Sequence, residues 1–169
     1  GSQWNDTIYG SHGETTFIGG QGNDRFISQG SHDTFIFRQG DGIDTLDLQR
    51  STLVEGASHR LVFEGIRFDE VRFTQDPSDL SKTLVIEYGE NDRLIINQFD
   101  LIRELPFSEL VFVDRTISGE EWFNHFVLTG SEASDEICGY DGVQNWIYGQ
   151  EGDDRLSGGI QDDHLFGGE

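Results

Sequence analysis

The stretch Gly19-Gly20-Gln21-Gly22-Asn23-Asp24-Arg25-Phe26-Ile27 decides the fold of this chain. It is a full copy of the nine-residue pattern G-G-x-G-x-D-x-U-x, in which U is a large apolar residue. The first six residues of such a unit form a turn, and the last three form a short strand. A single unit cannot bury its one apolar side chain, so copies of it must stack on one another. The stretch therefore predicts further units in register on both sides of it.

Further nonads lie in register with residues 19–27. They cover residues 1–9, 10–18, 28–36 and, after the inserted pair Phe37-Arg38, residues 39–47. The apolar position of the five units holds Ile8, Phe17, Phe26, Phe35 and Leu46. The Asp position holds Asp6, Thr15, Asp24, Asp33 and Asp44. A second run of four units starts at Gly130 and holds Asp135, Asn145, Asp154 and Asp163 in the Asp position. The spacing predicts two repeat blocks, over residues 1–48 and 130–169.

Residues 49–129 carry no such repeat and separate the two blocks. Short apolar runs predict strands over residues 61–63, 71–74, 83–88, 94–96 and 110–113. Gly89-Glu90-Asn91-Asp92 predicts a hairpin turn, and the capping box Ser118-Gly119-Glu120-Glu121 predicts a short helix that ends near Phe126. We expect this segment to cover four outward apolar positions of the first block, which are Tyr9, Ile18, Ile27 and Ile36. The predicted fold class is all-β: two parallel β-roll blocks flank a mostly antiparallel β module with one short helix.

The chain is strongly acidic. It has 32 Asp and Glu against 11 Lys and Arg, which gives a formal charge of -21. This charge argues against nucleic acids and anionic membranes as partners, and fits either a solvated acidic protein or one that carries many bound cations. The 13 Phe, 4 Tyr and 3 Trp argue against disorder. A single Cys permits no internal disulfide, so in a secreted protein we expect bound calcium instead of disulfides to stabilise the fold.

No motif of a familiar catalytic centre is present in the sequence. The five His show no zinc-binding spacing, and there is no G-x-S-x-G sequence or phosphate-binding loop. We therefore expect no enzyme activity. There is no signal peptide and no apolar run of the roughly 18 residues that a transmembrane helix needs. Gly167-Gly168-Glu169 opens another nonad, so we expect a truncated second block and a longer parent protein.

The turns of the nonads have the chemistry of a calcium site. Calcium prefers about six to eight oxygen ligands. Glycines allow positive φ and turn backbone carbonyls inward, and the Asp supplies charge. Because successive strands alternate between two sheets, turns that are two nonads apart share an edge. The expected pairs are Asp6 with Asp24, Asp24 with Asp44, Thr15 with Asp33, Asp135 with Asp154, and Asn145 with Asp163.

Residues 19–27 and 149–157 resemble the RTX family, the calcium-binding repeats of proteins exported by Gram-negative bacteria. Residues 61–73 are similar to the haemolysin-related non-repeat module that interrupts or follows RTX blocks. The resemblance implies a secreted module that folds on calcium binding outside the cell. It would be the folding and secretion scaffold of a larger toxin, adhesin or enzyme, with the parent chain and the type I secretion machinery as partners. The alternative is a module that binds a receptor, a sugar or a partner domain of an RTX adhesin or toxin.

The resemblance also implies the ligands, since an RTX site takes two carbonyls and one Asp carboxylate from each of two stacked turns. The first site would use Ser2, Trp4, Asp6, Gly19, Gln21 and Asp24. The second would use Gly20, Gly22, Asp24, Gln39, Asp41 and Asp44, and the third Ser11, Gly13, Thr15, Ser28, Gly30 and Asp33. The fourth would use Ser131, Ala133, Asp135, Gly149, Glu151 and Asp154, and the fifth Tyr140, Gly142, Asn145, Gly158, Ile160 and Asp163. Thr15 and Asn145 lack a carboxylate, so the third and fifth sites are expected to be weaker or empty.

Overall fold

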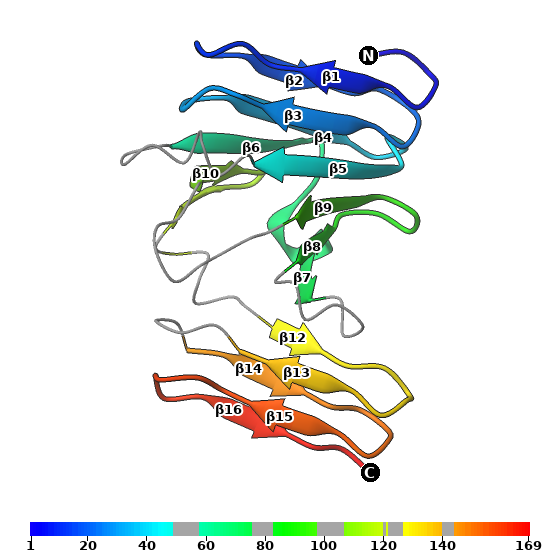
Figure 1. Ribbon diagram of the computed structural model, residues 1–169, viewed down its shortest axis with the longest axis vertical. Helices are drawn as coiled ribbons and strands as arrows, with labels where there is room; N and C mark the ends of the chain where they lie inside the picture. Colours follow the sequence, from blue (N-terminus) through cyan, green and yellow to red (C-terminus); the bar gives the residue numbers. More distant parts are fainter. Residues whose placement is uncertain (49–57, 76–82, 98–106, 120, 122–126, 140–143) are drawn as a thin grey trace.

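The computed structural model describes residues 1–48, 58–75, 83–97, 107–119, 121, 127–139 and 144–169. These residues form sixteen strands, and the other element with defined bounds among them is the 3-10 helix η1 (Phe68–Glu70). Figure 1 shows the strands as layers along the long axis, from the N-terminus at the top to the C-terminus at the bottom. The first repeat block, the middle segment and the second repeat block follow one another along this axis.

The nonads of the first block alternate between two parallel sheets. One sheet contains β1 (Thr7–Tyr9), β3 (Arg25–Ser28) and β5 (Ile43–Leu48), and the other contains β2 (Thr16–Ile18) and β4 (Thr34–Arg38). The register aligns the apolar positions, because Phe26 pairs with both Ile8 and Leu46. In the other sheet Phe17 pairs with Phe35. The alternation and the register are those that the nonad spacing predicts.

The apolar positions of the two sheets meet in a buried core. Phe17, Phe26 and Phe35 are each at most 1% exposed. The rings of Phe17 and Phe35 stack at 4.7 Å, and Phe26 meets Phe17 edge-on at 5.7 Å. Burying one such side chain contributes about 1.5–3 kcal/mol, and each ring pair adds about 0.5–1.5 kcal/mol. A large residue at this position of the nonad therefore holds the two sheets together.

Both sheets continue through the middle segment. Its strands are β6 (His59–Glu64), β7 (Arg72–Gln75), β8 (Leu84–Glu87), β9 (Arg93–Asn97), β10 (Phe107–Val111) and β11 (Thr116–Ser118). β6 pairs in parallel with β4, and β9 pairs in parallel with β5. From there β8 and β7 extend one sheet, and β10 and β11 extend the other. The resulting six-stranded and five-stranded sheets each contain strands from both sides of residue 48, where the sequence predicts a domain boundary.

Within the middle segment the described pairs β7–β8, β8–β9 and β10–β11 are antiparallel, whereas β6–β10 is parallel, as is the junction with the first block. The predicted hairpin turn over residues 89–92 connects β8 and β9. The predicted cover is wrong for Tyr9 and Ile18, which are 68% and 37% exposed, whereas Ile27 is 6% exposed. In its described part the segment continues the edges of both sheets. The predicted helix falls largely outside the described residues. At its start the Glu121 N–H donates to Ser118 Oγ at 3.3 Å.

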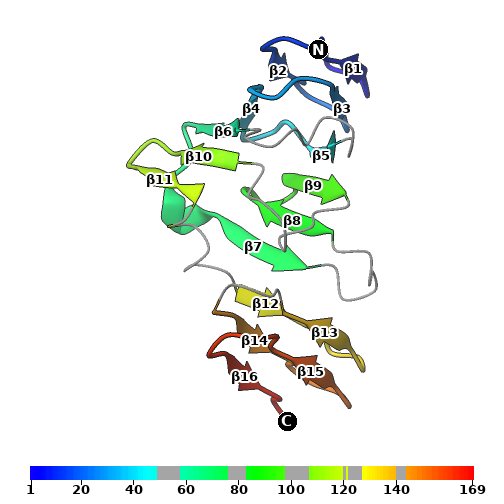
Figure 2. The same ribbon diagram turned by 60° about the vertical axis from the view of Figure 1, so that its left-hand side comes forward.

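The second block has the same arrangement with shorter strands. One sheet contains β12 (Val127–Thr129), β14 (Trp146–Tyr148) and β16 (His164–Phe166), and the other contains β13 (Glu136–Cys138) and β15 (Arg155–Ser157). All of these pairs are parallel. Leu128, Ile137 and Ile147 are buried, whereas Leu165 is 43% exposed. β12 lies beside β7, so the second block continues the stack beyond the middle segment (Figure 2).

Candidate metal centre

The turns that precede the strands stack in columns along the sheet edges. In the first block one column holds Asp6, Asp24 and Asp44. The Asp6 N–H donates to Asp24 Oδ1 at 2.7 Å, and the Asp24 N–H donates to Asp44 Oδ1 at 2.9 Å. The same hydrogen bond joins the other predicted pairs: Thr15 to Asp33 at 2.8 Å, Asp135 to Asp154 at 3.0 Å, and Asn145 to Asp163 at 2.8 Å. The structure therefore brings together all five pairs that the spacing predicts.

The stacked turns touch through glycines and carbonyls. Gly20 and Gly22 have φ of 87° and 124°, and a Cβ built on Gly20 would lie 2.4 Å from the Ser2 carbonyl oxygen. The predicted ligand carbonyls that lie against a glycine in this way belong to Ser2, Trp4, Gly13, Gly19, Gly22, Ala133, Gly149 and Gly158. The other predicted ligands in the described part lie in the same turns: Ser11, Gly20, Gln21, Ser28, Gly30, Gln39, Asp41, Ser131, Glu151 and Ile160. Tyr140 and Gly142 lie outside the described residues.

Three carboxylate oxygens in these columns are buried with no hydrogen-bond partner among the described residues. They are Asp24 Oδ2, Asp44 Oδ2 and Asp154 Oδ2. Burying a charged oxygen without a partner is strongly unfavourable. The turns that carry these carboxylates lie against backbone carbonyls of a neighbouring turn, at Gly20 with Ser2, Gly42 with Gly22 and Gly152 with Ala133. Carbonyls are hard oxygen ligands of the kind that calcium prefers. The residues present therefore fit a bound calcium ion at these positions.

Raised pKa values in the first column also favour a bound cation. Burial raises the pKa of Asp44 to about 7, and the neighbouring carboxylates of Asp24, Asp41 and Asp92 add to the increase. Burial also raises the pKa of Asp41, against the effect of the hydrogen bond that its carboxylate accepts from the Arg38 N–H. A bound cation would favour the ionised forms of Asp44 and Asp41.

Asp92 is a functional candidate that the repeat spacing does not reveal. Its carboxylate accepts hydrogen bonds from the N–H groups of Gly40 and Gly42, both at 2.9 Å. Both glycines have φ in the left-handed region, and successive N–H groups in such a turn form an anion-binding nest. The sequence signal is a shortened unit in which Gly89 and Asp92 precede the apolar Leu94.

In the part of the chain that the structure describes, no group of three or more His, Cys, Asp or Glu side chains is placed to hold a metal ion. The nonad chemistry predicts that an ion in the columns takes most of its ligands from backbone carbonyls. The described residues also include no helix that is long and apolar enough to cross a membrane.

Comparison with known families agrees with this geometry. The family of RTX calcium-binding nonapeptide repeats matches residues 1–26, 9–46 and 144–169. These matches cover the stacked turns of the first block and the last two turns of the second, which hold Asp154 and Asp163. No curated protein matches the chain. RTX repeats bind calcium as a structural ligand, which is the role that the buried carboxylates require. Residues 1–46 and 144–169 at the two ends of this chain are therefore RTX calcium-binding nonapeptide repeats.

Proposed function

We propose that this chain is a calcium-binding module built as two parallel β-rolls joined by the middle segment, and that it folds when it binds calcium outside the cell. One observation carries the proposal: the buried Oδ2 atoms of Asp24, Asp44 and Asp154 have no hydrogen-bond partner in the described part of the chain. Each lies in a column of stacked turns, where a calcium ion would neutralise it together with the facing Asp.

The size of the effect supports a role in folding. Extracellular calcium modules bind with Kd of about 10⁻⁴–10⁻³ M, and cytosolic calcium lies far below this range. A site filled at about ten times its Kd adds about 1.4 kcal/mol to the free energy of unfolding. Several such sites supply a large share of the roughly 5–15 kcal/mol by which folded domains are stable. Without the ion, the charge of -21 and the buried carboxylates oppose folding.

In this proposal a type I secretion system exports the chain unfolded, and the chain folds as it emerges. It serves as scaffold of a larger secreted toxin, adhesin or enzyme and has no catalytic role of its own. The support is the RTX repeats at both ends of the chain. The middle segment caps the first roll, since β6 and β9 pair with the last strands of its two sheets.

Circular dichroism of the purified chain with a calcium titration tests the folding role. We expect a β signal in millimolar calcium that is lost in chelator, while magnesium at the same concentration restores little of it. Magnesium is the matched control because it has the same charge but demands a smaller octahedral site. An equal β signal in chelator and in millimolar calcium would refute the proposal.

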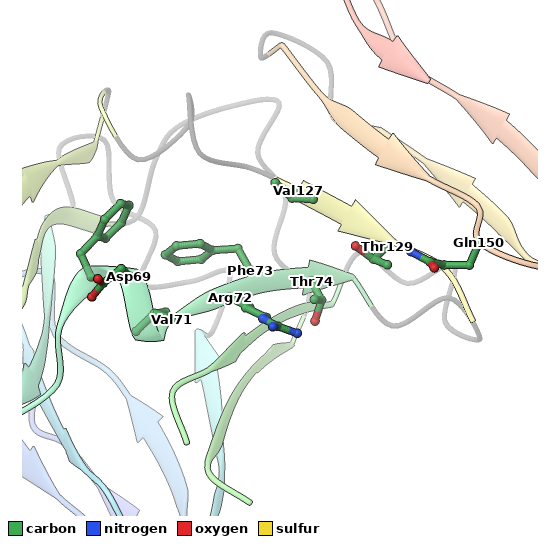
Figure 3. A pocket seen from close by; sticks show the side chains of 9 residues that line it. Asp69, Val71, Arg72, Phe73, Thr74, Val127, Thr129 and Gln150 are labelled. Atoms are coloured by element: carbon green, nitrogen blue, oxygen red, sulfur yellow. The ribbon is translucent and has the colours of Figure 1, made fainter. Parts of the chain in front are cut away.

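A second candidate function is recognition of a receptor, a sugar or a partner domain. It is favoured by a cavity of about 500 Å³ beside β7 and β12, shown in Figure 3. Phe73 and Val127 give the cavity apolar walls, and Arg72 adds a charged group. Binding to a panel of glycans, measured by surface plasmon resonance, tests this function. Glycan binding that is lost in Arg72→Ala but kept in the control Arg93→Ala would support this function. The absence of binding to any glycan would refute sugar recognition.

A further inference from the structure

We infer that calcium binds along only one edge of each repeat block, and that side-chain hydrogen-bond donors replace the ion along the other edge. The carboxylate edges are the turn columns of Asp6, Asp24 and Asp44, and of Asp135 and Asp154. The donor edges are the columns of Thr15 and Asp33, and of Asn145 and Asp163. The inference rests on the proposed calcium-binding function and sets its stoichiometry at three ions instead of five.

The carboxylate edges and the donor edge of the first block differ at the second oxygen of the later Asp. In every pair, Oδ1 of the later Asp accepts the N–H of the earlier residue, at 2.7–3.0 Å. Along the carboxylate edges Oδ2 is then left buried without a partner among the described residues, in Asp24, Asp44 and Asp154. These are the oxygens that need an ion.

The donor edge of the first block satisfies its own carboxylate. Asp33 is fully buried, its Oδ1 accepts the Thr15 N–H at 2.8 Å, and its Oδ2 accepts the hydroxyl of Ser28 at 2.5 Å. Thr15 brings no charge to the facing turn. An ion between these turns would therefore face one carboxylate, and that carboxylate already has a donor on each oxygen.

The next position of this donor edge is also neutral. Nδ1 of the buried His59 accepts the Asp33 N–H at 3.1 Å, as Oδ1 of an Asp does elsewhere. The Arg60 N–H donates to the Asp33 carbonyl at 2.9 Å, and Leu61 pairs with Phe35. His59 thus stands in the Asp position of a further unit that lacks the glycine pattern. This edge has one carboxylate in three positions, whereas the facing carboxylate edge has three.

In the second block an amide occupies the place of the ion. Nδ2 of Asn145 donates to the Gly158 carbonyl at 2.7 Å and to Asp163 Oδ1 at 2.8 Å. Both acceptors belong to residues that the RTX pattern assigns to the fifth calcium site. The fully buried Asn145 side chain therefore joins the two turns that an ion would join. Calcium could bind there only if the Asn145 amide broke both hydrogen bonds and turned its oxygen toward the ion. The ion would then have only one carboxylate ligand, that of Asp163.

Native mass spectrometry of the full chain in calcium, with titration calorimetry, tests the inference. We expect three ions: one between Asp6 and Asp24, one between Asp24 and Asp44, and one between Asp135 and Asp154. A count of five would overturn the one-edge assignment and leave the proposed function intact. A count of zero would refute the proposed function itself.

Two variants of the second block distinguish its edges. Asp154→Asn should reduce the count from three to two, whereas the matched change Asp163→Asn should leave it at three. An equal loss of one ion in both variants would overturn the inference. Asn145→Asp should raise the count to four, because it removes the amide donor and supplies a second facing carboxylate. If this variant still binds three ions while keeping its calcium-induced β signal, the amide is not what excludes the ion.

Discussion

Asp24→Asn should weaken calcium-dependent stability more than any other single change in the carboxylate edge of the first block. Asp24 accepts the Asp6 N–H on Oδ1, donates its own N–H to Asp44, and has a buried Oδ2 that no described residue contacts by a hydrogen bond. It therefore faces two of the three proposed ions, whereas Asp6 faces one. Asn keeps the size of the side chain and one acceptor oxygen but removes the charge.

The magnitude follows from the number of sites lost. At a calcium concentration about ten times Kd, each ion adds about 1.4 kcal/mol. Asp24→Asn should therefore remove up to about 3 kcal/mol, and Asp6→Asn about half as much. For a chain of this size, about 2–4 °C of Tm accompanies each kcal/mol, so the expected losses are about 6–12 °C and about 3–6 °C. In chelator, where the wild-type chain is expected to lose its β signal, Asp24→Asn should not reduce that signal further, because it removes a buried charge that lies between Asp6 and Asp44.

Thermal unfolding followed by circular dichroism, in millimolar calcium and in chelator, measures both effects. Asp153→Asn is the matched control, since Asp153 is an exposed turn residue of the second block and belongs to none of the five Asp-position pairs. Equal Tm losses for Asp24→Asn and Asp6→Asn in calcium would show that Asp24 is not shared between two ions. A lower β signal in chelator for Asp24→Asn than for the wild-type chain would show that Asp24 also stabilises the fold without the ion.

Three further predictions follow from the buried and strained groups. The pKa of Asp44 in the calcium-free fold, about 7, lies above the ordinary value of 3.8, so the stability of that fold is present at low pH and is lost as pH rises through this range. Calcium uptake near pH 6.5 should then release protons, which calorimetry in buffers of different ionisation heat detects and which Asp44→Asn should abolish. Asp92→Asn should lower the free energy of unfolding by about 1–3 kcal/mol, because one of the two turn N–H groups loses its charged acceptor. Urea unfolding measures this loss. A loss no larger than that of the exposed control Glu90→Gln would contradict the prediction. Gln150 has φ of 84°, so Gln150→Gly should raise the free energy of unfolding by up to about 1 kcal/mol, and a decrease in the same urea assay would show that the turn is not strained there.

The register of the first block is predictable because the nonad has one apolar position and a constant period. Two nonads bring Phe26 beside Leu46. The inserted pair Phe37-Arg38 lengthens β4, where it pairs with Phe63 and Glu64, and does not shift this register. The continuation of both sheets into the middle segment is not predictable in this way. β6 has the Asp-position and apolar residues of a unit, His59 and Leu61, without its glycines. β9 follows a turn that is shorter than that of a nonad. Asp92 in this turn still accepts hydrogen bonds from the preceding turn, but from the N–H groups of Gly40 and Gly42 instead of that of Asp44.

The pairing of the Asp positions is likewise predictable from spacing, but the need for an ion at each pair is not. Asp24 and Asp33 both fit the nonad, and both are buried. The structure separates them through the contacts of their second oxygens, since Asp33 Oδ2 has a hydroxyl partner and Asp24 Oδ2 has none among the described residues. Such a difference depends on a side chain that lies five residues away in sequence.

That side chain belongs to Ser28, which occupies the first position of its nonad. The residue at this position decides whether a side chain there can donate a hydrogen bond to the Asp of the same turn. Where the position is glycine, a Cβ would lie 2.2 Å from Asp24 Oδ2 at Gly19 and 2.1 Å from Asp154 Oδ2 at Gly149, so the glycine keeps the oxygen free of side-chain contact. Where the position is Ser28, the hydroxyl reaches into the same space and donates to the carboxylate. At Gly19 and Gly149 the first glycine of the nonad therefore leaves Oδ2 of Asp24 and Asp154 without a donor from that position. At Ser28 the hydroxyl supplies that donor to Asp33.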